Sequence, residues 1–181
     1  MKKFYFILIF LFLFQAITNA ASHNVWKKHC IKNQKNKEVC SVSTKLTLTN
    51  EKQEVLGNLV IIDIRYFNYT EKNLNLIDEE KKTYELEEKK IKRPFMIINV
   101  PMGIDLRSGL VINIGKFAGK VPFVRCTQKG CETNMLVSPQ IRKAMEASES
   151  MKLKFFVYGK QNPNVVELSL MGFKKEFAKL M

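Results

Sequence analysis

Short strand-type runs separated by turn residues constrain the fold of this chain more than any other feature. Residues 40–49 alternate apolar and polar positions, which is the period of a half-buried β-strand. The runs at 57–69 and 93–101 are continuous stretches of β-branched and aromatic residues, typical of strands covered on both faces. Similar runs follow at 109–115, 151–159 and 164–172, and PMG, RSG, FAGK and QNPN are turn signals between them. The pattern predicts a mainly β single domain, an antiparallel β-sandwich or a barrel-like fold.

Two segments have helical spacing instead. At about 138–148, Ser138 can cap a helix and Pro139 suits its first turn. At about 172–180, Phe173 and Phe177 recur at helical spacing after the breaker Gly172. We expect one or two short helices, each packing an apolar stripe on the core.

The first 20 residues have the pattern of a secretory signal peptide. Lys2 and Lys3 precede an apolar run from Phe4 to Phe14, and small residues stand near Ala20. The run is 11 residues long, whereas a helix that spans a bilayer needs about 20. The sequence therefore predicts removal of residues 1–20, no transmembrane helix afterwards, and a single exported β-rich domain at 21–181.

The chain is basic, with 30 Lys and Arg against 17 Asp and Glu and a formal charge of +13. Of these 30 residues 25 are Lys, and they are spread along the chain, whereas proteins that read nucleic acids cluster Arg. We therefore expect a solvated basic surface and no nucleic-acid partner, and an anionic partner in the envelope or on a host surface stays open. Residues 78–93 mix both signs of charge with few apolar positions, which predicts a solvated loop or hairpin.

Four cysteines remain after residue 20, namely Cys30, Cys40, Cys126 and Cys131. An even number in an exported domain predicts disulfides, and the simplest of the three connectivities pairs Cys30 with Cys40 and Cys126 with Cys131. A zinc site made of these thiolates, with His29 as a substitute ligand, is one alternative. A thiol oxidoreductase is another, although such enzymes place Cys-x-x-Cys at the start of a helix.

Catalytic motifs are weak. The two histidines, His23 and His29, both lie near the expected new N-terminus, and neither has a carboxylate at suggestive spacing. Asp63 lies within an apolar run, where it faces solvent or pairs with a cation, and Asp105 is placed to cap a turn. No phosphate-binding glycine loop is present, because GKFAGK lacks the required spacing. We expect no enzymatic activity, no cofactor and no metal.

Several blocks in order resemble the invasion-associated locus B family of exported Gram-negative bacterial proteins. They are W..HC near the start of the domain, NVPMGIDLRSGLVINI, VPFVRCTQKGCETNMLV and LSLMGFKKEFAKL. The resemblance implies a secreted or envelope-associated protein and supplies no catalytic residues. The resemblance also implies a structural role for the glycine and proline block at 101–109. The block would reverse the chain between a strand ending at Val100 and one beginning near Leu110, and a binding loop there is the alternative. The residues assigned to structural turns are Pro101, Gly103, Leu106, Gly109, Gly130, Gly172 and Phe173.

The sequence thus predicts a non-enzymatic exported protein of the invasion-associated locus B type. It would act by binding an unknown partner in the periplasm, at the outer membrane or outside the cell. Two alternatives stay open. A periplasmic chaperone-like module for outer-membrane proteins needs an exposed sheet edge that accepts a client strand. An unrecognised hydrolase or thiol-redox enzyme needs a deep pocket with convergent polar groups. The sequence does not indicate an oligomeric state.

Overall fold

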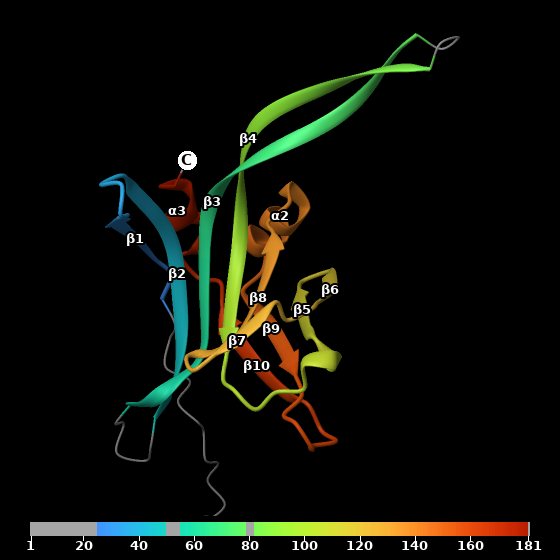
Figure 1. Ribbon diagram of the computed structural model, residues 1–181. Coiled ribbons are helices and arrows are strands. Elements are labelled where there is room, and N and C mark those ends of the chain that lie inside the picture. Colours follow the sequence, from blue (N-terminus) through green and yellow to red (C-terminus); the bar gives the residue numbers. More distant parts are fainter. Residues whose placement is uncertain (1–24, 50–54, 79–81, 181) are drawn as a thin grey trace, which may run out of the picture.

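A computed structural model describes residues 25–49, 55–78 and 82–180 of the chain (Figure 1). The expected signal peptide, residues 1–20, and His23 lie outside the described residues. The described helices are all too short to span a lipid bilayer.

In the described part of the chain, ten antiparallel strands form two sheets. The larger sheet has the order β1-β2-β3-β4-β8-β7 and the smaller one the order β10-β9-β5-β6. The strands of the larger sheet are β1 Lys27–Lys32, β2 Glu38–Thr49, β3 Val55–Asp78, β4 Thr83–Val100, β7 Arg125–Thr127 and β8 Gly130–Leu136. Those of the smaller sheet are β5 Leu110–Ile114, β6 Phe117–Val121, β9 Ser150–Phe155 and β10 Asn164–Ser169. The mainly β prediction is confirmed as two open sheets, and the barrel-like alternative is wrong.

One hydrophobic core lies between the two sheets. Alternate residues of β3 and β4 contribute from the larger sheet, because side chains along a strand point to opposite faces in turn. The smaller sheet contributes alternate residues of β5, β9 and β10. These side chains, none more than 6% exposed, are Ile62, Ile64, Met96, Ile98, Ile112, Ile114, Leu153, Phe155, Val166 and Leu168.

Two helices close the core. In α2, Pro139–Ala147, the hydroxyl of Ser138 accepts a hydrogen bond from the Ile141 amide at 3.2 Å, so the predicted cap is confirmed. In α3, Phe173–Ala178, Phe173 and Phe177 are buried, as the spacing predicted. The Trp26 ring lies 5.0 Å from the Phe173 ring in an edge-to-face contact, and its indole nitrogen donates to the Ser169 carbonyl at 3.0 Å.

A two-stranded arm projects from the larger sheet (Figure 1). Strand β2 pairs with β3 only as far as Arg65, and β8 pairs with β4 only from Phe95 onward. Beyond these points β3 and β4 pair with each other alone, over residues 66–78 and 83–94, which we call the arm. Of the segment predicted as a loop or hairpin at 78–93, residues 83–93 belong to β4, the returning strand of this hairpin. The hairpin alternative is therefore correct, but the arm begins 12 residues before residue 78.

Two local predictions are wrong. The runs of β3 and β4 are covered on one face only, because the outer face of the larger sheet carries Asp63 and Arg65 among its apolar residues, and Phe67 there is 40% exposed. The FAGK segment is not a turn, since Phe117–Val121 pairs with β5 as an edge strand. The reversal occurs just before it at Gly115, which takes a φ of 55° that favours glycine.

Candidate functional site

The two predicted disulfides are present, and each joins an outermost strand of the larger sheet to its neighbour. Cys30 of β1 lies opposite Cys40 of β2, and Cys126 of β7 lies opposite Cys131 of β8. The two pairs therefore lie at opposite ends of the strand order β1-β2-β3-β4-β8-β7. The alternative of one zinc ion held by four thiolates is wrong for this fold, because the pairs do not converge. The thiol-oxidoreductase geometry is absent too, since all four cysteines lie in strands.

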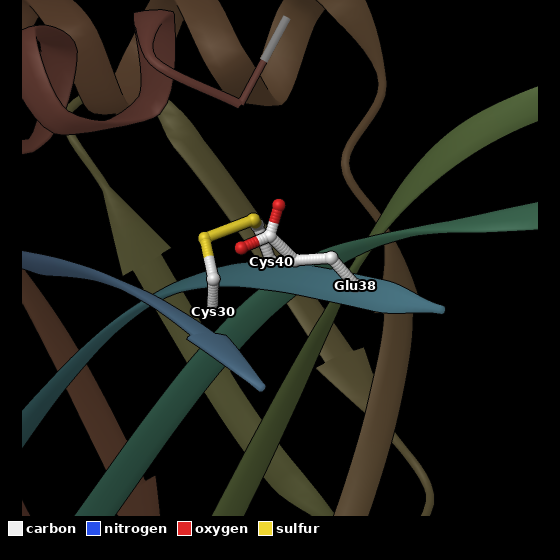
Figure 2. A group of neighbouring side chains, drawn as sticks. All are labelled: Cys30, Glu38 and Cys40. Atoms are coloured by element: carbon white, nitrogen blue, oxygen red, sulfur yellow. A yellow bond between two sulfur atoms is a disulfide. The ribbon is translucent and has the colours of Figure 1, made fainter. Parts of the chain in front are cut away.

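Glu38 lies beside the first disulfide, as Figure 2 shows, and donor atoms of Cys30, Glu38 and Cys40 lie within 4.8 Å of one another. Metal ions bind thiolate sulfur, whereas these two sulfur atoms are bonded to each other at 2.09 Å. In the oxidised protein the group offers a metal only one exposed carboxylate.

The glycine and proline block forms the predicted reversal between β4 and β5. Gly103 and Gly109 have φ angles of 83° and 65°, and the Asp105 carboxylate caps the short 3-10 helix η1, Leu106–Ser108. Asp105 accepts hydrogen bonds from the Arg107 amide at 3.2 Å and the Ser108 hydroxyl at 2.6 Å. The Ser108 bond is the main cause that lowers the pKa of Asp105 below its ordinary value.

The backbone of this block is also held from outside. The Asp105 amide donates to the Phe156 carbonyl, and the Tyr158 amide donates to the Gly103 carbonyl, both at 2.8 Å. Pro101 is half-buried and Leu106 is half-exposed at its surface. The remaining assigned residues also have structural positions, because Gly130 packs on the backbone of Val100 and Gly172 precedes α3 with a φ of 83°. A binding role for the block gains no support from these contacts.

One pocket lies on the outer face of the larger sheet, where the arm leaves the body. We call it the outer-face pocket; its volume is about 660 Å³. Phe67, Tyr69 and Phe95 supply its aromatic wall, and the rings of Phe67 and Phe95 meet edge to face at 5.7 Å. Phe67 and Tyr69 remain 40% and 51% exposed. Large aromatic side chains exposed together are typical of a surface that binds a partner.

Each carboxylate of the outer-face pocket is paired with an arginine. Asp63 accepts from the Arg65 Nε at 2.6 Å, as its predicted pairing with a cation requires, and Glu132 lies 3.0 Å from Arg125. The histidine of the described chain, His29, lies in β1 at one end of the sheet rather than in this pocket. The arrangement offers hydrogen bonds and an aromatic surface, but no general base with a free nucleophile beside it.

The second pocket, here the basic pocket, lies at the base of the arm beside the start of α2, and its volume is about 500 Å³. Lys92, Arg93 and Arg142 line it, together with apolar and hydroxyl side chains. None of the described residues that line it is Asp or Glu. Phe177 lies at its floor, and the Lys92 ammonium lies 5.3 Å from the centre of the Tyr66 ring. Arg93 pairs with Glu71 at 3.1 Å and Arg142 with Glu146 at 3.5 Å, so an anionic group in this pocket would share these two arginines with the glutamates.

The sequence did not single out the residues that line the two pockets, because the pattern of apolar and polar residues around them is that of an ordinary strand. Phe67, Tyr69 and Lys92 belong to runs that look like ordinary strand and charged loop. One signal was available. Asn68 and Thr70 are polar and alternate with Tyr66 on the same face of the strand, so the apolar inner face ends at Tyr66.

Comparison with known proteins agrees with these features. The sequence model of the family described as "Invasion associated locus B (IalB) protein" matches residues 69–181. The chain belongs to the invasion-associated locus B family. This family is not known as a family of enzymes, and its members are associated with the cell envelope. No curated protein sequence matches the chain.

A solved structure shares the fold. The crystal structure of invasion associated protein b from Bartonella henselae superposes with a TM-score of 0.59 and 15% sequence identity, covering 88% of this chain and 92% of that one. At this identity the likeness concerns the fold alone. The resemblance drawn from the sequence blocks is thus confirmed by the family model and by the shared fold.

Proposed function

We propose that this protein is a non-enzymatic, exported member of the invasion-associated locus B family that binds a partner through its arm and the outer-face pocket. The observation that carries the proposal is the exposure of Phe67 and Tyr69 at the base of a hairpin that projects beyond the rest of the sheet. A chain that only needed a stable core would gain little from leaving about half of each ring in water, because hydrophobic stabilisation requires burial.

Binding energy is available at this surface. Burying an exposed aromatic side chain in an interface contributes about 2 kcal/mol or more where it becomes a central contact. The two arginine–carboxylate pairs beside the aromatics supply fixed hydrogen-bonding groups that already have partners, so covering them leaves no uncompensated charge. The pocket therefore combines an apolar anchor with a polar rim.

Export is supported by the two disulfides, because such bonds persist in oxidising compartments such as the periplasm or the exterior of the cell. The signal-type residues 1–20 point in the same direction. We propose periplasmic residence, with outer-membrane association or secretion as the two further destinations.

The test is retention of the purified protein on native envelope fractions. The double variant Phe67→Ser and Tyr69→Ser should lose retention by at least tenfold, since it removes the aromatic anchor. Tyr158→Ser is the matched control, because Tyr158 is 74% exposed and lies outside the pocket. Both proteins should keep one cooperative unfolding transition, which excludes misfolding as the cause, although loss of the Phe67–Phe95 contact should lower the melting temperature of the double variant slightly. Equal retention of the double variant and the control would refute binding through Phe67 and Tyr69.

A salt series on the same fractions separates the aromatic surface from the basic charge. Retention through buried apolar contacts survives moderate salt, whereas attraction between exposed charges falls once the Debye length is about 8 Å. We expect wild-type retention to persist, so a steep loss with salt would show that the charge carries the binding.

A chaperone-like role is the second candidate, favoured by one observation. Strand β4 in the arm has a long edge beside which the described residues place no strand, and such an edge is the acceptor that a client strand requires. The assay is suppression of aggregation of an unfolded outer-membrane protein. Wild type should suppress aggregation, and a variant with the arm shortened should not.

A further inference from the structure

Strand β4 runs on where its neighbour stops. Strand β8 pairs with β4 from Val100 to Phe95, and the last bond between them runs from the Val137 amide to the Pro94 carbonyl at 2.9 Å. The chain then turns away into α2. From Arg93 back to Thr83, β4 has β3 on one side and no described strand on the other. The position that β8 would occupy if it continued is open.

The main-chain groups at this edge have a definite direction. The Pro94 carbonyl points toward β8, away from β3. Backbone groups alternate in direction along an antiparallel strand, and the pairing with β3 has no register shift between Pro94 and Leu86. The amide and carbonyl of Lys92, Lys90 and Glu88 therefore face the open position. A strand placed there would find donors and acceptors at every second residue.

Near the base of the arm the charges beside this edge are positive, whereas Glu87 and Glu88 stand farther out along it. Lys89, Lys90 and Lys92 are exposed and make no ion pair with a described residue, and the Lys92 ammonium lies over the Tyr66 ring. Glu88 is neutralised by Lys72 at 2.8 Å. The basic pocket, with Lys92, Arg93 and Arg142, lies directly beyond the end of the open position. An incoming chain thus meets three lysines near the base of the arm, and the two arginines at its end already pair with Glu71 and Glu146.

We propose that the free edge of β4 binds an acidic, extended segment of another protein, which adds to the arm as an antiparallel strand. This inference rests on the proposed function and names the chemistry of the partner. Charge selects an acidic segment, and the same charge disfavours a second copy of this chain, which carries +13. Main-chain hydrogen bonds supply affinity, and side-chain pairing sets the register.

The register can be stated. Residues opposite Lys92, Lys90 and Lys89 should be acidic, and the residue opposite Ile91 should be apolar, because directly opposed side chains on a sheet share a face. The expected core of the ligand is Glu-Val-Glu-Glu. A suitable probe is the labelled peptide Thr-Val-Glu-Val-Glu-Glu-Val-Thr, titrated against the purified, disulfide-bonded protein.

Two further peptides separate strand addition from plain charge attraction. One replaces every Glu by Lys; the other keeps the charge but carries N-methyl groups on the nitrogens that would face β4. The acidic peptide should bind, and both others should bind at least tenfold more weakly. Amide hydrogen exchange should slow at Glu88, Lys90 and Lys92, whose N–H groups face the open position.

Variants of the protein test the same edge. Lys90→Gln removes one charge and should weaken binding about threefold, whereas Lys90→Pro also removes an outward N–H and should weaken it about fivefold further. Proline at this position leaves the ladder to β3 intact, because the Lys90 amide faces the open side. Lys116→Gln is the matched control, since Lys116 is exposed in the turn between β5 and β6.

Three results would overturn the inference. Equal binding of the N-methylated peptide would show attraction without a strand, and slowed exchange at β1 or β10 would move the site to another edge. Binding to phosphatidylglycerol vesicles without any binding of the peptide would assign the lysines to a lipid surface. If the peptide fails while the Phe67 and Tyr69 variant still loses envelope retention, the acidic-strand inference falls and the proposed function stands.

Discussion

Gly130 stands at the first position of β8, where the backbone of β4 passes close to it. Its φ is 125°, and a Cβ added there would lie 2.3 Å from the Val100 carbonyl oxygen. Non-bonded atoms do not approach so closely, so Gly130→Ala must push β8 away from β4 where Val100 pairs with Cys131. We predict a large loss of stability from this single methyl group.

Two other glycines separate the contributions to that loss. Gly103 has a φ of 83° and no atom within 4 Å of an added Cβ, so Gly103→Ala meets the backbone cost alone, about 1 to 2 kcal/mol. Gly57 has neither a positive φ nor a close atom, and Gly57→Ala should change the free energy of unfolding by less than about 1 kcal/mol. Gly130→Ala has the same cost of a positive φ and also forces the backbone to shift. We therefore expect it to lower the free energy of unfolding by about 3 to 5 kcal/mol.

Urea unfolding measures the series, because Trp26 is the one tryptophan of the chain and is 1% exposed. Its fluorescence should follow one cooperative transition. In a domain of this size the expected loss for Gly130→Ala corresponds to a fall in melting temperature of about 10 °C. If Gly130→Ala lowers the free energy of unfolding by an amount within about 1 kcal/mol of the loss for Gly103→Ala, the close approach of Gly130 to Val100 is refuted.

Three further predictions concern the disulfides, the arm and one carboxyl. Reduction should add four hydrogens to the intact mass, and Cys126→Ser with Cys131→Ser should cost about 2 kcal/mol in urea unfolding; free thiols in the purified protein would contradict the pairing. Replacing residues 73–87 by an Asn-Gly turn should leave the melting temperature nearly unchanged, because the arm pairs only with itself; loss of cooperative unfolding would show otherwise. The pKa of Asp105 is lowered in the fold, chiefly by the bond from Ser108, so its stabilising effect is present above the ordinary pKa of 3.8 and disappears as pH falls through the lower folded value. The stability difference between wild type and Asp105→Asn should therefore be constant from about pH 7 to pH 5 and shrink below about pH 4, and a pH-independent difference would count against this role.

Much of the fold could be predicted from local pattern. The cap at Ser138, the positive φ angles at Gly103 and Gly109, and the pairing of neighbouring cysteines are each set by a few adjacent residues. Local chemistry of this kind depends little on what the rest of the chain does. The β-sandwich follows from the same alternation summed over many strands.

The candidate site could not be predicted in the same way. Phe67 and Tyr69 continue a strand in which Ile62 and Ile64 are buried, and nothing in the run up to Tyr66 marks where the sheet ends and the arm begins. Their exposure depends on where β2 stops pairing with β3, which is a contact between residues more than 20 apart. The free edge of β4 likewise depends on β8 turning into a helix after Leu136. Long-range pairing decides both, and a single sequence does not contain its register.

The disulfides also bear on how the chain reaches its oxidised state. Each bond joins cysteines that follow one another in sequence, separated by 10 and by 5 residues. A chain that enters an oxidising compartment with its N-terminus first presents Cys30 and Cys40 long before Cys126 emerges. Pairing in order of appearance therefore yields the native bonds directly. An oxidant alone should suffice for maturation, without a disulfide isomerase to correct wrong pairs.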